Sequence, residues 1–522
     1  MNLLKIQKKI IKKIWIFFND NKKLFFIQKF LSLITIYIIE AIFIAFKKRK
    51  WQLIKIKFLC LLGCEKIEAA LVLLTEIEIE RSYPKDNEDE IRLLYQSLCN
   101  YCIENEKLHL CIEIFKRRTE SHPQNLWAWR ILLDFNWFLC DYESVLNYHS
   151  KFLTVRNEYA LMKNYDSSIK YFGSYFTFSI GHICMLAEHI MIKKMNGNFE
   201  KKDILYVDER KVANSTFLNY IKESYEIVNS NSSSNSIREN DIDNLQDPFA
   251  YCIFWNNEWQ HYFDIRANFY NEWSSKFMNP FLNLTKDDEE YGRSKLSSFN
   301  VPLSSWFVVI HVRDSAGGSL RNANILDYIE AIKEITDRGG WVIRIGNSNM
   351  PSIQVRERFI DLSQINEKDD RLEIFLIASS LFVISTASGP ANIPILFGKM
   401  SIQTNLIPFR HSIPNKADIA IPVLFFSKSK NRLLTFYEIL ESNISSSEIL
   451  TNYDTDLVLI KNHSDDIKYA TLEMLQKALS KIDNEITEND IRFSNICRKL
   501  NVAFSPKLSQ HFLKKYSNLL QS

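Results

Sequence analysis

Two polar side chains follow a short apolar strand in this sequence, and together they could contact a phosphate or move a proton. The segment 306–310 is apolar throughout, and His311 and Arg313 follow it at alternate positions. An arginine presents a planar fork of donors that matches a phosphate, and a histidine can donate to an anion or accept a proton. The alternative for Arg313 is an ion pair with Asp314 or another acid, and for His311 an orienting or core role.

A second strand end offers backbone donors for an anion. The apolar segment 381–384 runs into a turn that contains Ser388, Gly389 and Pro390. Proline fits the first turn of a helix predicted for 391–397, because no hydrogen bond there needs its missing N–H. The free N–H groups and the dipole at such a helix start favour an anion. The alternative for Ser388 is a plain helix cap.

The sequence predicts that a parallel sheet holds these side chains in place. Three apolar segments, 306–310, 341–345 and 381–384, alternate with helical patterns, which is typical of parallel strands buried on both faces. Ligands of such sheets bind at the carboxyl ends of the strands. That edge of the sheet would also carry Arg321, Arg344, Gly346 and Ser385.

Glycine usage points to the same stretch. The chain has only 12 glycines in 522 residues, and eight of them lie between 292 and 398. A chain so poor in glycine keeps it where the backbone turns tightly or approaches a ligand. Gly339 and Gly398 follow helical patterns and are expected to be helix caps. Gly346 and Gly389 are either loop glycines or ligand-facing ones.

A weaker strand–helix–strand pattern lies earlier in the chain. A strand is predicted for 175–179, a turn at Gly181 and His182, a helix for 183–195 and a further strand for 203–207. Such a turn lets a helix N-terminus approach a ligand. His182 joins His311 and Asp314 as a candidate catalytic base.

Several chemistries lack their motifs. The sequence has no GxxxxGK[ST] loop for nucleotide hydrolysis and no GxGxxG turn for a dinucleotide, and the turn at Ser388 lacks the first glycine of a GxSxG elbow. The missing GxGxxG turn argues against a nicotinamide or flavin cofactor, and none is expected. The core segment has no DxD pair, so metal-dependent transfer is not expected either. Cys99 and Cys102 form a CxxC near His109 and Cys111, but without a second paired ligand set they are interpreted as core thiols of a reducing compartment.

The net charge of +3 hides an asymmetry along the chain. Residues 1–57 hold 14 Lys or Arg and 2 acidic residues, a charge of +12, whereas the remainder carries −9. Residues 30–46 form an apolar run that is short for a bilayer span and lacks a signal-peptide cleavage site. An interfacial amphipathic helix on an anionic membrane is predicted, with a spanning segment and a buried helix as alternatives. The acidic body argues against nucleic-acid binding.

Residues 60–160 show a helical-hairpin pattern. The hairpin turns at Asn105 and Asp141 are 36 positions apart, close to the period of tetratricopeptide-type repeats. Most of that repeat's small-residue pattern is missing, so a plain helical bundle is the alternative. Repeats of this type would offer a surface for a protein partner.

The segments 306–314, 321–324, 340–346 and 388–390, with Tyr328, resemble a bacterial family assigned to the glycosyltransferases and found with surface-polysaccharide genes. The resemblance runs from about residue 179 to 479, and members often carry tetratricopeptide-like helices ahead of the transferase. It implies a GT-B fold, with two Rossmann-like domains facing across a cleft and the nucleotide sugar on the second. It adds Asn322 to the candidate substrate contacts. The HxR at His311 and Arg313 also resembles, more weakly, the diphosphate-binding motif of GDP-fucose transferases.

These observations predict an α/β protein, a metal-independent glycosyltransferase that moves a sugar from a nucleotide diphosphate sugar to a glycan or lipid-linked acceptor. It would lie in the cytoplasm, peripherally associated with the inner membrane. The rival hypothesis is an interaction protein whose helical repeats bind a partner and whose α/β part is a degenerate scaffold. The predicted regions are a membrane-proximal segment (1–57), helical hairpins (58–165), an acceptor domain (166–300), a nucleotide-sugar domain (301–485) and a loosely packed C-terminal tail (486–522).

Overall fold

The computed structural model describes most of the chain beyond residue 56. The described residues are 57–62, 66–79, 88–104, 107–139, 141–197, 201–229, 239–246, 252–255, 258–277, 280–315, 319–347, 350–354, 357–365, 368–409, 412–442, 456–480 and 485–521. The predicted membrane-proximal segment lies outside them except for Lys57. Within the described part, every helix is too short or too polar to cross a membrane. The chain divides into two compact units between Pro123 and Gln124, inside the region predicted as one helical domain.

The first unit is helical. Its longer helices are α4 (Ile67–Ile79), α5 (Glu88–Glu104) and α6 (Leu108–Ser121). Helices α5 and α6 pack together through buried side chains that include Leu98 and Phe115. Cys102 and Cys111 are fully buried free thiols between them, as the interpretation of the CxxC as core residues expects. The relation of this hairpin to tetratricopeptide repeats stays a prediction.

The second unit begins with another helix pair and a small sheet. Asn125 and Asp141 cap the first turns of α7 (Leu126–Phe138) and α8 (Tyr142–Met162) by accepting from backbone N–H groups. A three-stranded parallel sheet follows, in the order β1 (Tyr171–Phe172), β2 (Asp203–Val207) and β3 (Tyr225–Asn229). Helix α9 (Ile180–Met195) connects β1 to β2, and α10 (Ser215–Asn219) lies between β2 and β3. Beyond them come α11 (Glu239–Leu245), the hairpin β4 (Cys252–Trp255) and β5 (Glu258–His261), α12 (Tyr262–Phe277) and α13 (Lys286–Ser298).

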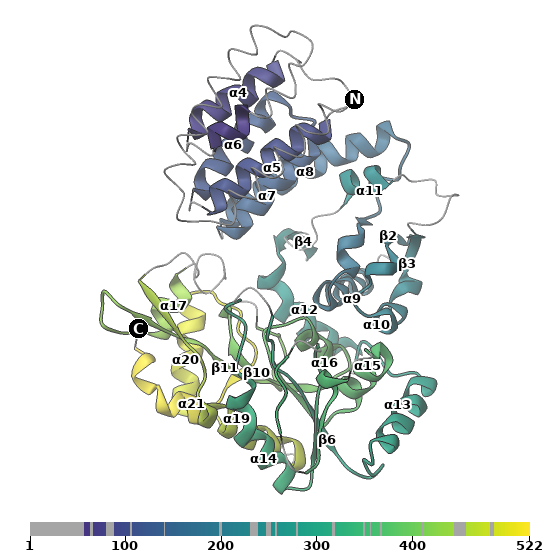
Figure 1. Ribbon diagram of the computed structural model, residues 1–522, viewed down its shortest axis with the longest axis vertical. Helices are drawn as coiled ribbons and strands as arrows, with labels where there is room; N and C mark the ends of the chain where they lie inside the picture. The colour runs from purple at the N-terminus through teal and green to yellow at the C-terminus, as the bar shows by residue number, and fades with distance from the viewer. Residues whose placement is uncertain are drawn as a thin grey trace, which may run out of the picture. The chain divides into compact units, whose positions relative to one another are not determined.

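A seven-stranded sheet forms the centre of this unit (Figure 1). The spatial order is β15-β11-β10-β9-β6-β7-β8, and every pairing is parallel. Counted along the chain from β6, the first six strands have the order 3-2-1-4-5-6 of doubly wound nucleotide-binding sheets, and β15 adds a seventh. The strands are β6 (Phe307–His311), β7 (Trp341–Arg344), β8 (Phe359–Asp361), β9 (Phe382–Thr386), β10 (Met400–Leu406), β11 (Ile419–Pro422) and β15 (Lys507–Leu508).

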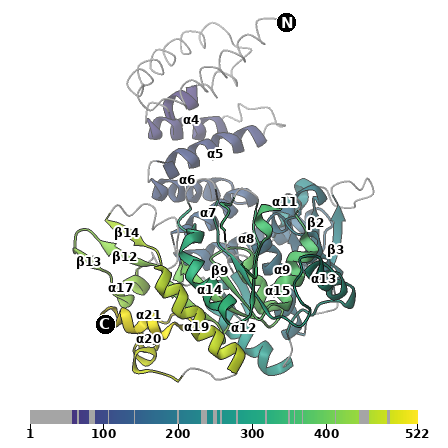
Figure 2. The same cartoon turned by 60° about the horizontal axis from the view of Figure 1, so that its bottom comes forward.

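Both faces of this sheet are covered, which explains the apolar runs of β6, β7 and β9. One face packs on α14 (Ile329–Asp337) and α19 (Ser464–Ser480), and the other on α15 (Asp370–Ser379) and α16 (Ile393–Leu396). Figure 2 shows α14 and α19 side by side. Alternate side chains of each strand enter the two cores: Val308 and Ile310 join the first, and Phe307 and Val309 the second.

The second core continues into the small sheet. Phe172, Ile183 and Leu205 from the β1–β3 region belong to the same buried cluster as Val309 and Val383 of the large sheet. The mixed α/β class and the large parallel sheet agree with the expectation from sequence. The first sheet has three strands and shares its core with the second. The arrangement of two doubly wound domains facing across a cleft stays a prediction.

Two local expectations were wrong. The residues predicted as a strand at 175–179 form a 3-10 turn, η3 (Ser174–Thr177), and α9 begins at Ile180, so Gly181 and His182 lie in its first helical turn. Ser179 caps that helix, which explains its early start. The predicted C-terminal tail is folded: it contains α20 (Glu488–Lys499), strand β15 and α21 (Gln510–Lys515), and Phe493 and Phe512 are buried.

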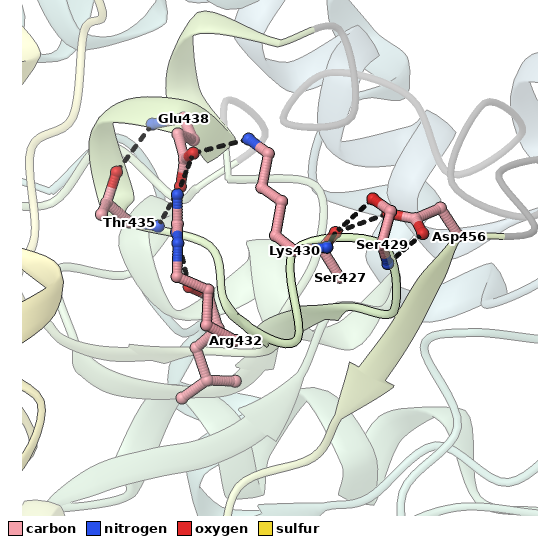
Figure 3. Close-up of polar contacts among 8 residues, drawn as sticks. Ser427, Ser429, Lys430, Arg432, Thr435, Glu438 and Asp456 are labelled. Carbon is pink, nitrogen blue, oxygen red and sulfur yellow. Dashed lines mark hydrogen bonds and ion pairs between the residues drawn. The ribbon is translucent and has the colours of Figure 1, made fainter.

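A small antiparallel sheet begins directly after β11 in the chain. Its order is β13-β12-β14, with β12 (Leu424–Ser427), β13 (Arg432–Leu433) and β14 (Leu457–Ile460). Figure 3 shows the polar contacts that fix its hairpin: Arg432 and Lys430 bind Glu438 of α17 (Phe436–Glu441), and Ser427 and Ser429 bind Asp456. Glu438 also completes a capping box with Thr435. These contacts give the charged and hydroxyl side chains of this hairpin a structural role.

Candidate functional site

The candidate residues gather where the strand order of the large sheet reverses. Strands β6 and β9 are neighbours in space although β7 and β8 lie between them in sequence, and His311 of β6 pairs with Ser385 of β9. In doubly wound sheets this reversal opens a crevice at the carboxyl ends of the two strands, where ligands bind. Both strands end there, at His311 and Thr386.

His311 and Ser388 are in direct contact at this position. The His311 Nδ1 atom lies 3.0 Å from the Ser388 hydroxyl oxygen, and each residue is 7% exposed. The Ser388 hydroxyl also donates to the Thr386 carbonyl at 3.1 Å, which leaves its oxygen free to accept from a protonated Nδ1. Both members of the contact were predicted site residues, and they are 77 residues apart in the sequence.

The His311 ring is neutral at pH 7. Burial, with the nearby charges of Arg313 and Arg344, lowers its pKa from about 6.5 to about 4. A group with so low a pKa is a weak general base at neutral pH, because it holds an abstracted proton poorly. The arrangement suits a hydrogen-bonding role for His311 better than the predicted catalytic one.

Arg313 is held through its backbone at the same edge. Its N–H donates to the Thr386 hydroxyl at 3.0 Å, and its carbonyl accepts from the Ala323 N–H at 2.9 Å. The residue is half-buried, and its guanidinium lies close enough to His311 to lower that residue's pKa. These bonds tie the first residues after β6 to the end of β9. Thr386 was not among the predicted site residues, although its position at a strand end is a signal for it.

Arg344 has protein partners. It pairs across strands with Asp361, and its Nη1 atom lies 3.0 Å from that carboxylate and 2.7 Å from the Pro351 carbonyl oxygen. The residue is 1% exposed and pairs with Ile310, so its side chain projects from the face opposite to that of His311. Its charge contributes to the site through the pKa of His311, while direct contact with a substrate stays a prediction.

The remaining strand-end candidates have structural contacts of their own. Ser385 is fully buried in β9, and its hydroxyl has no hydrogen-bond partner among the described residues. Gly346 has a φ of 153°, and a Cβ there would meet the Met350 sulfur at 2.4 Å. Asn322 exchanges hydrogen bonds with Ser315, which closes the loop after β6, and Arg321 is half-buried beside it.

Gly389 and Gly181, which lie in the two predicted ligand-binding turns, contact each other. A Cβ on Gly389 would lie 2.9 Å from the Gly181 backbone nitrogen, so the loop after β9 rests against the first turn of α9. His182, in the same turn, is half-buried, and its Nδ1 atom lies 3.2 Å from the Tyr175 carbonyl oxygen. Asp314 is exposed. The fold therefore brings His311, Ser388 and Arg313 together. Gly181 and Gly389 form the contact on which the Ser388 loop packs.

The helix after Ser388 differs from the prediction. Instead of one helix over 391–397, a 3-10 turn, η8 (Pro390–Asn392), leads into the single turn of α16. Pro390 occupies the first turn as expected, but the Ser388 side chain bonds to His311 and Thr386 in place of capping. Gly339 and Gly398 have φ values of 87° and 66° after helix ends, which confirms them as caps.

A buried ionic network behind this loop was not predicted. Glu188 of α9 accepts from Arg266 of α12 at 2.6 Å and from the Tyr270 hydroxyl at 2.8 Å, and the Tyr262 hydroxyl also bonds to it. Arg266 donates in addition to Asn392, at 3.1 Å. Glu188 and Arg266 are 78 residues apart in otherwise ordinary helices, so no local pattern marks them.

Comparisons with known proteins add little to this geometry. No family model matches the chain, and no curated protein does. Among solved structures it is similar to a glycosyl transferase of family 9 from Veillonella parvula, with a TM-score of 0.26 and 9% identity, covering 57% of this chain and 79% of that one. A likeness at this level carries no argument about fold or activity.

Proposed function

We propose that this protein is a glycosyltransferase that binds the diphosphate of a nucleotide sugar at the reversal point of its seven-stranded sheet. The observation that carries the proposal is the contact of His311 with Ser388 between β6 and β9, with Arg313 beside it. This is the position at which doubly wound sheets bind nucleotides. The sequence resemblance of these segments to bacterial glycosyltransferases supplies the reaction class.

The charges of the site support an anionic ligand. Burial is the main cause of the lowered pKa of His311, and the positive charges of Arg313 and Arg344 lower it further. These two charges support an anionic ligand next to a neutral ring. In glycosyl transfer from a nucleotide sugar the leaving diphosphate develops the largest charge, and positioned donors that meet this charge lower the barrier. Arg313 would bind the diphosphate with its guanidinium fork. The neutral His311 donates its Nδ1–H to Ser388, so its Nε2 atom would accept from a hydroxyl of the donor's ribose or first sugar.

The remaining parts of the proposal extend the sequence predictions. Charge stabilisation by Arg313 would make transfer independent of a divalent metal, and the acceptor would be a glycan or a lipid-linked glycan. Attachment to an anionic membrane through residues 1–57 would place the enzyme next to lipid-linked acceptors.

A thermal-shift screen of the full-length protein tests the proposal. UDP, GDP, ADP and dTDP would each be added with EDTA, or with Mg²⁺ or Mn²⁺ in its place. We expect one diphosphate to raise the Tm with EDTA present, because a ligand at 100 times its Kd stabilises a folded protein by ~2.7 kcal/mol. A shift that requires the metal would contradict metal independence. No shift with any nucleotide would favour the scaffold hypothesis.

A further inference from the structure

One side chain, Asn392, supports the loop that carries Ser388. Its amide nitrogen lies 3.2 Å from the Ser388 carbonyl oxygen and 3.5 Å from that of Gly389. Its amide oxygen faces the other way and accepts from the Arg266 Nη2 atom at 3.1 Å. Asn392 therefore connects the site loop to helix α12, which lies outside the large sheet.

Arg266 is itself fixed in place. The residue is 4% exposed, and the nitrogen that donates to Asn392 also donates to Glu188, which is fully buried in α9. Two tyrosine hydroxyls, from Tyr262 and Tyr270, bond to the same carboxylate. One nitrogen of the Arg266 guanidinium therefore reaches both acceptors, the Glu188 carboxylate and the Asn392 amide oxygen.

Stability alone is a poor explanation for this network. Burying an ion pair costs desolvation that the pair's attraction often does not recover, and apolar side chains of similar volume are commonly as stable or more so. What a hydrogen-bonded buried pair does provide is a defined geometry. Here that geometry ends at the Ser388 carbonyl, one residue from the support contact between Gly389 and Gly181.

We propose that Arg266 and Asn392 are positioning residues that hold the Ser388 hydroxyl against the His311 ring and so set the affinity of the site for the donor diphosphate. Only the second part of this inference, the effect on diphosphate affinity, rests on the proposed function. The first part, the coupling of Asn392 to the His311–Ser388 contact, concerns the ligand-free protein.

Two substitutions test the hydrogen bonds that Asn392 makes to Arg266 and to the Ser388 carbonyl. Asn392→Leu keeps the approximate volume and removes both the donor and the acceptor. Asn392→Asp keeps an acceptor for Arg266 but cannot donate to the Ser388 carbonyl. The matched control is Asn415→Leu: Asn415 is also half-buried and also bonds through both ends of its amide, but it lies near the amino end of β11, at the opposite edge of the sheet.

The first readout is the ¹⁵N NMR spectrum of the full-length protein labelled at histidine, with His311 assigned from a His311→Gln sample. We expect Asn392→Leu and Asn392→Asp to move the His311 Nδ1 resonance, because its partner hydroxyl is displaced, whereas Asn415→Leu leaves it in place. The second readout is the Kd of the nucleoside diphosphate that shifts the wild-type Tm, which should rise about five- to tenfold in both Asn392 variants, the loss of about one hydrogen bond.

The outcomes are distinct. If the His311 resonance and the Kd are unchanged in both Asn392 variants while their Tm falls as in Asn415→Leu, the network is only structural and the inference is wrong. If no diphosphate binds the wild type, the proposed function fails. In that case the His311 resonance alone decides whether Asn392 positions Ser388.

Discussion

At the scale of single residues, environment decides which of the candidate side chains can act. His311 and Arg344 are both buried and both end a strand of the same sheet, but they project from opposite faces. Arg344 meets Asp361 there, whereas His311 meets Ser388 at the reversal point. Sequence spacing identified both positions. It could not distinguish the roles, because the partner of each residue lies at or just after the end of another strand.

The depressed pKa of His311 predicts a pH dependence of stability. The unfolded chain binds a proton near pH 6.5 and the folded one near pH 4, so stability that is complete above pH 6.5 is lost as the pH falls toward 4. Between pH 7 and 5 the loss from this residue is about 2 kcal/mol. Urea unfolding of His311→Gln should therefore change less with pH than that of the wild type. A His463→Gln control, at an exposed position, should follow the wild type, and an equally steep profile for His311→Gln would contradict this account.

At the scale of elements, the sequence predicted the strands of the large sheet better than their surroundings. Continuous apolar segments identified β6, β7 and β9 because burial on both faces leaves no other pattern. The segment 175–179 also suggests a strand because it is rich in aromatic residues, but residues 174–177 form the turn η3 and Ser179 caps α9. The folded C-terminus was missed because β15 has only two residues and pairs with a strand far away in sequence.

The contact of the β9 loop with α9 gives an element-scale prediction. Gly389→Ala would place a Cβ 2.9 Å from the Gly181 nitrogen and 3.2 Å from the Ile180 Cβ, and backbone has to move to admit it. Such overpacking costs about 1–3 kcal/mol. The reciprocal Gly181→Ala meets only the Gly389 Cα at 3.5 Å and lies in a helix, so it should be neutral or slightly stabilising. Equal urea-unfolding free energies for the two variants would show that this contact is not tight.

At the scale of the whole molecule, the described chain forms a helical unit and a larger α/β unit whose two sheets share one core. The parallel sheet and its ligand-binding edge could be predicted from the alternation of strands and helices. The shared core could not, because it depends on which helices cover the sheet. The Arg266 network was equally inaccessible, since helical patterns do not reveal a partner in another helix.

The charge asymmetry of the chain gives a whole-molecule prediction. Residues 1–57 carry +12 and an apolar run, so deleting them should move the protein from the membrane pellet to the soluble fraction. Replacing Lys47, Lys48, Arg49 and Lys50 by Gln should weaken binding to vesicles containing phosphatidylserine, because each basic residue near such a surface contributes ~1 kcal/mol. A truncated protein that still pellets with membranes would show that another surface makes the attachment.

The proposed function depends above all on the binding of the donor diphosphate by Arg313. Its sharpest test is isothermal titration of Arg313 variants with the diphosphate that shifts the wild-type Tm. A charge-assisted hydrogen bond contributes roughly 1.5–3 kcal/mol, so Arg313→Ala should raise the Kd by about one to two orders of magnitude. Arg313→Lys should not restore binding, because an ammonium keeps the charge but loses the two-pronged donor geometry. Arg293→Lys, at an exposed ion pair on α13, is the control and should bind normally. Folded Arg313→Ala and Arg313→Lys proteins that bind the diphosphate as tightly as the wild type would contradict the account.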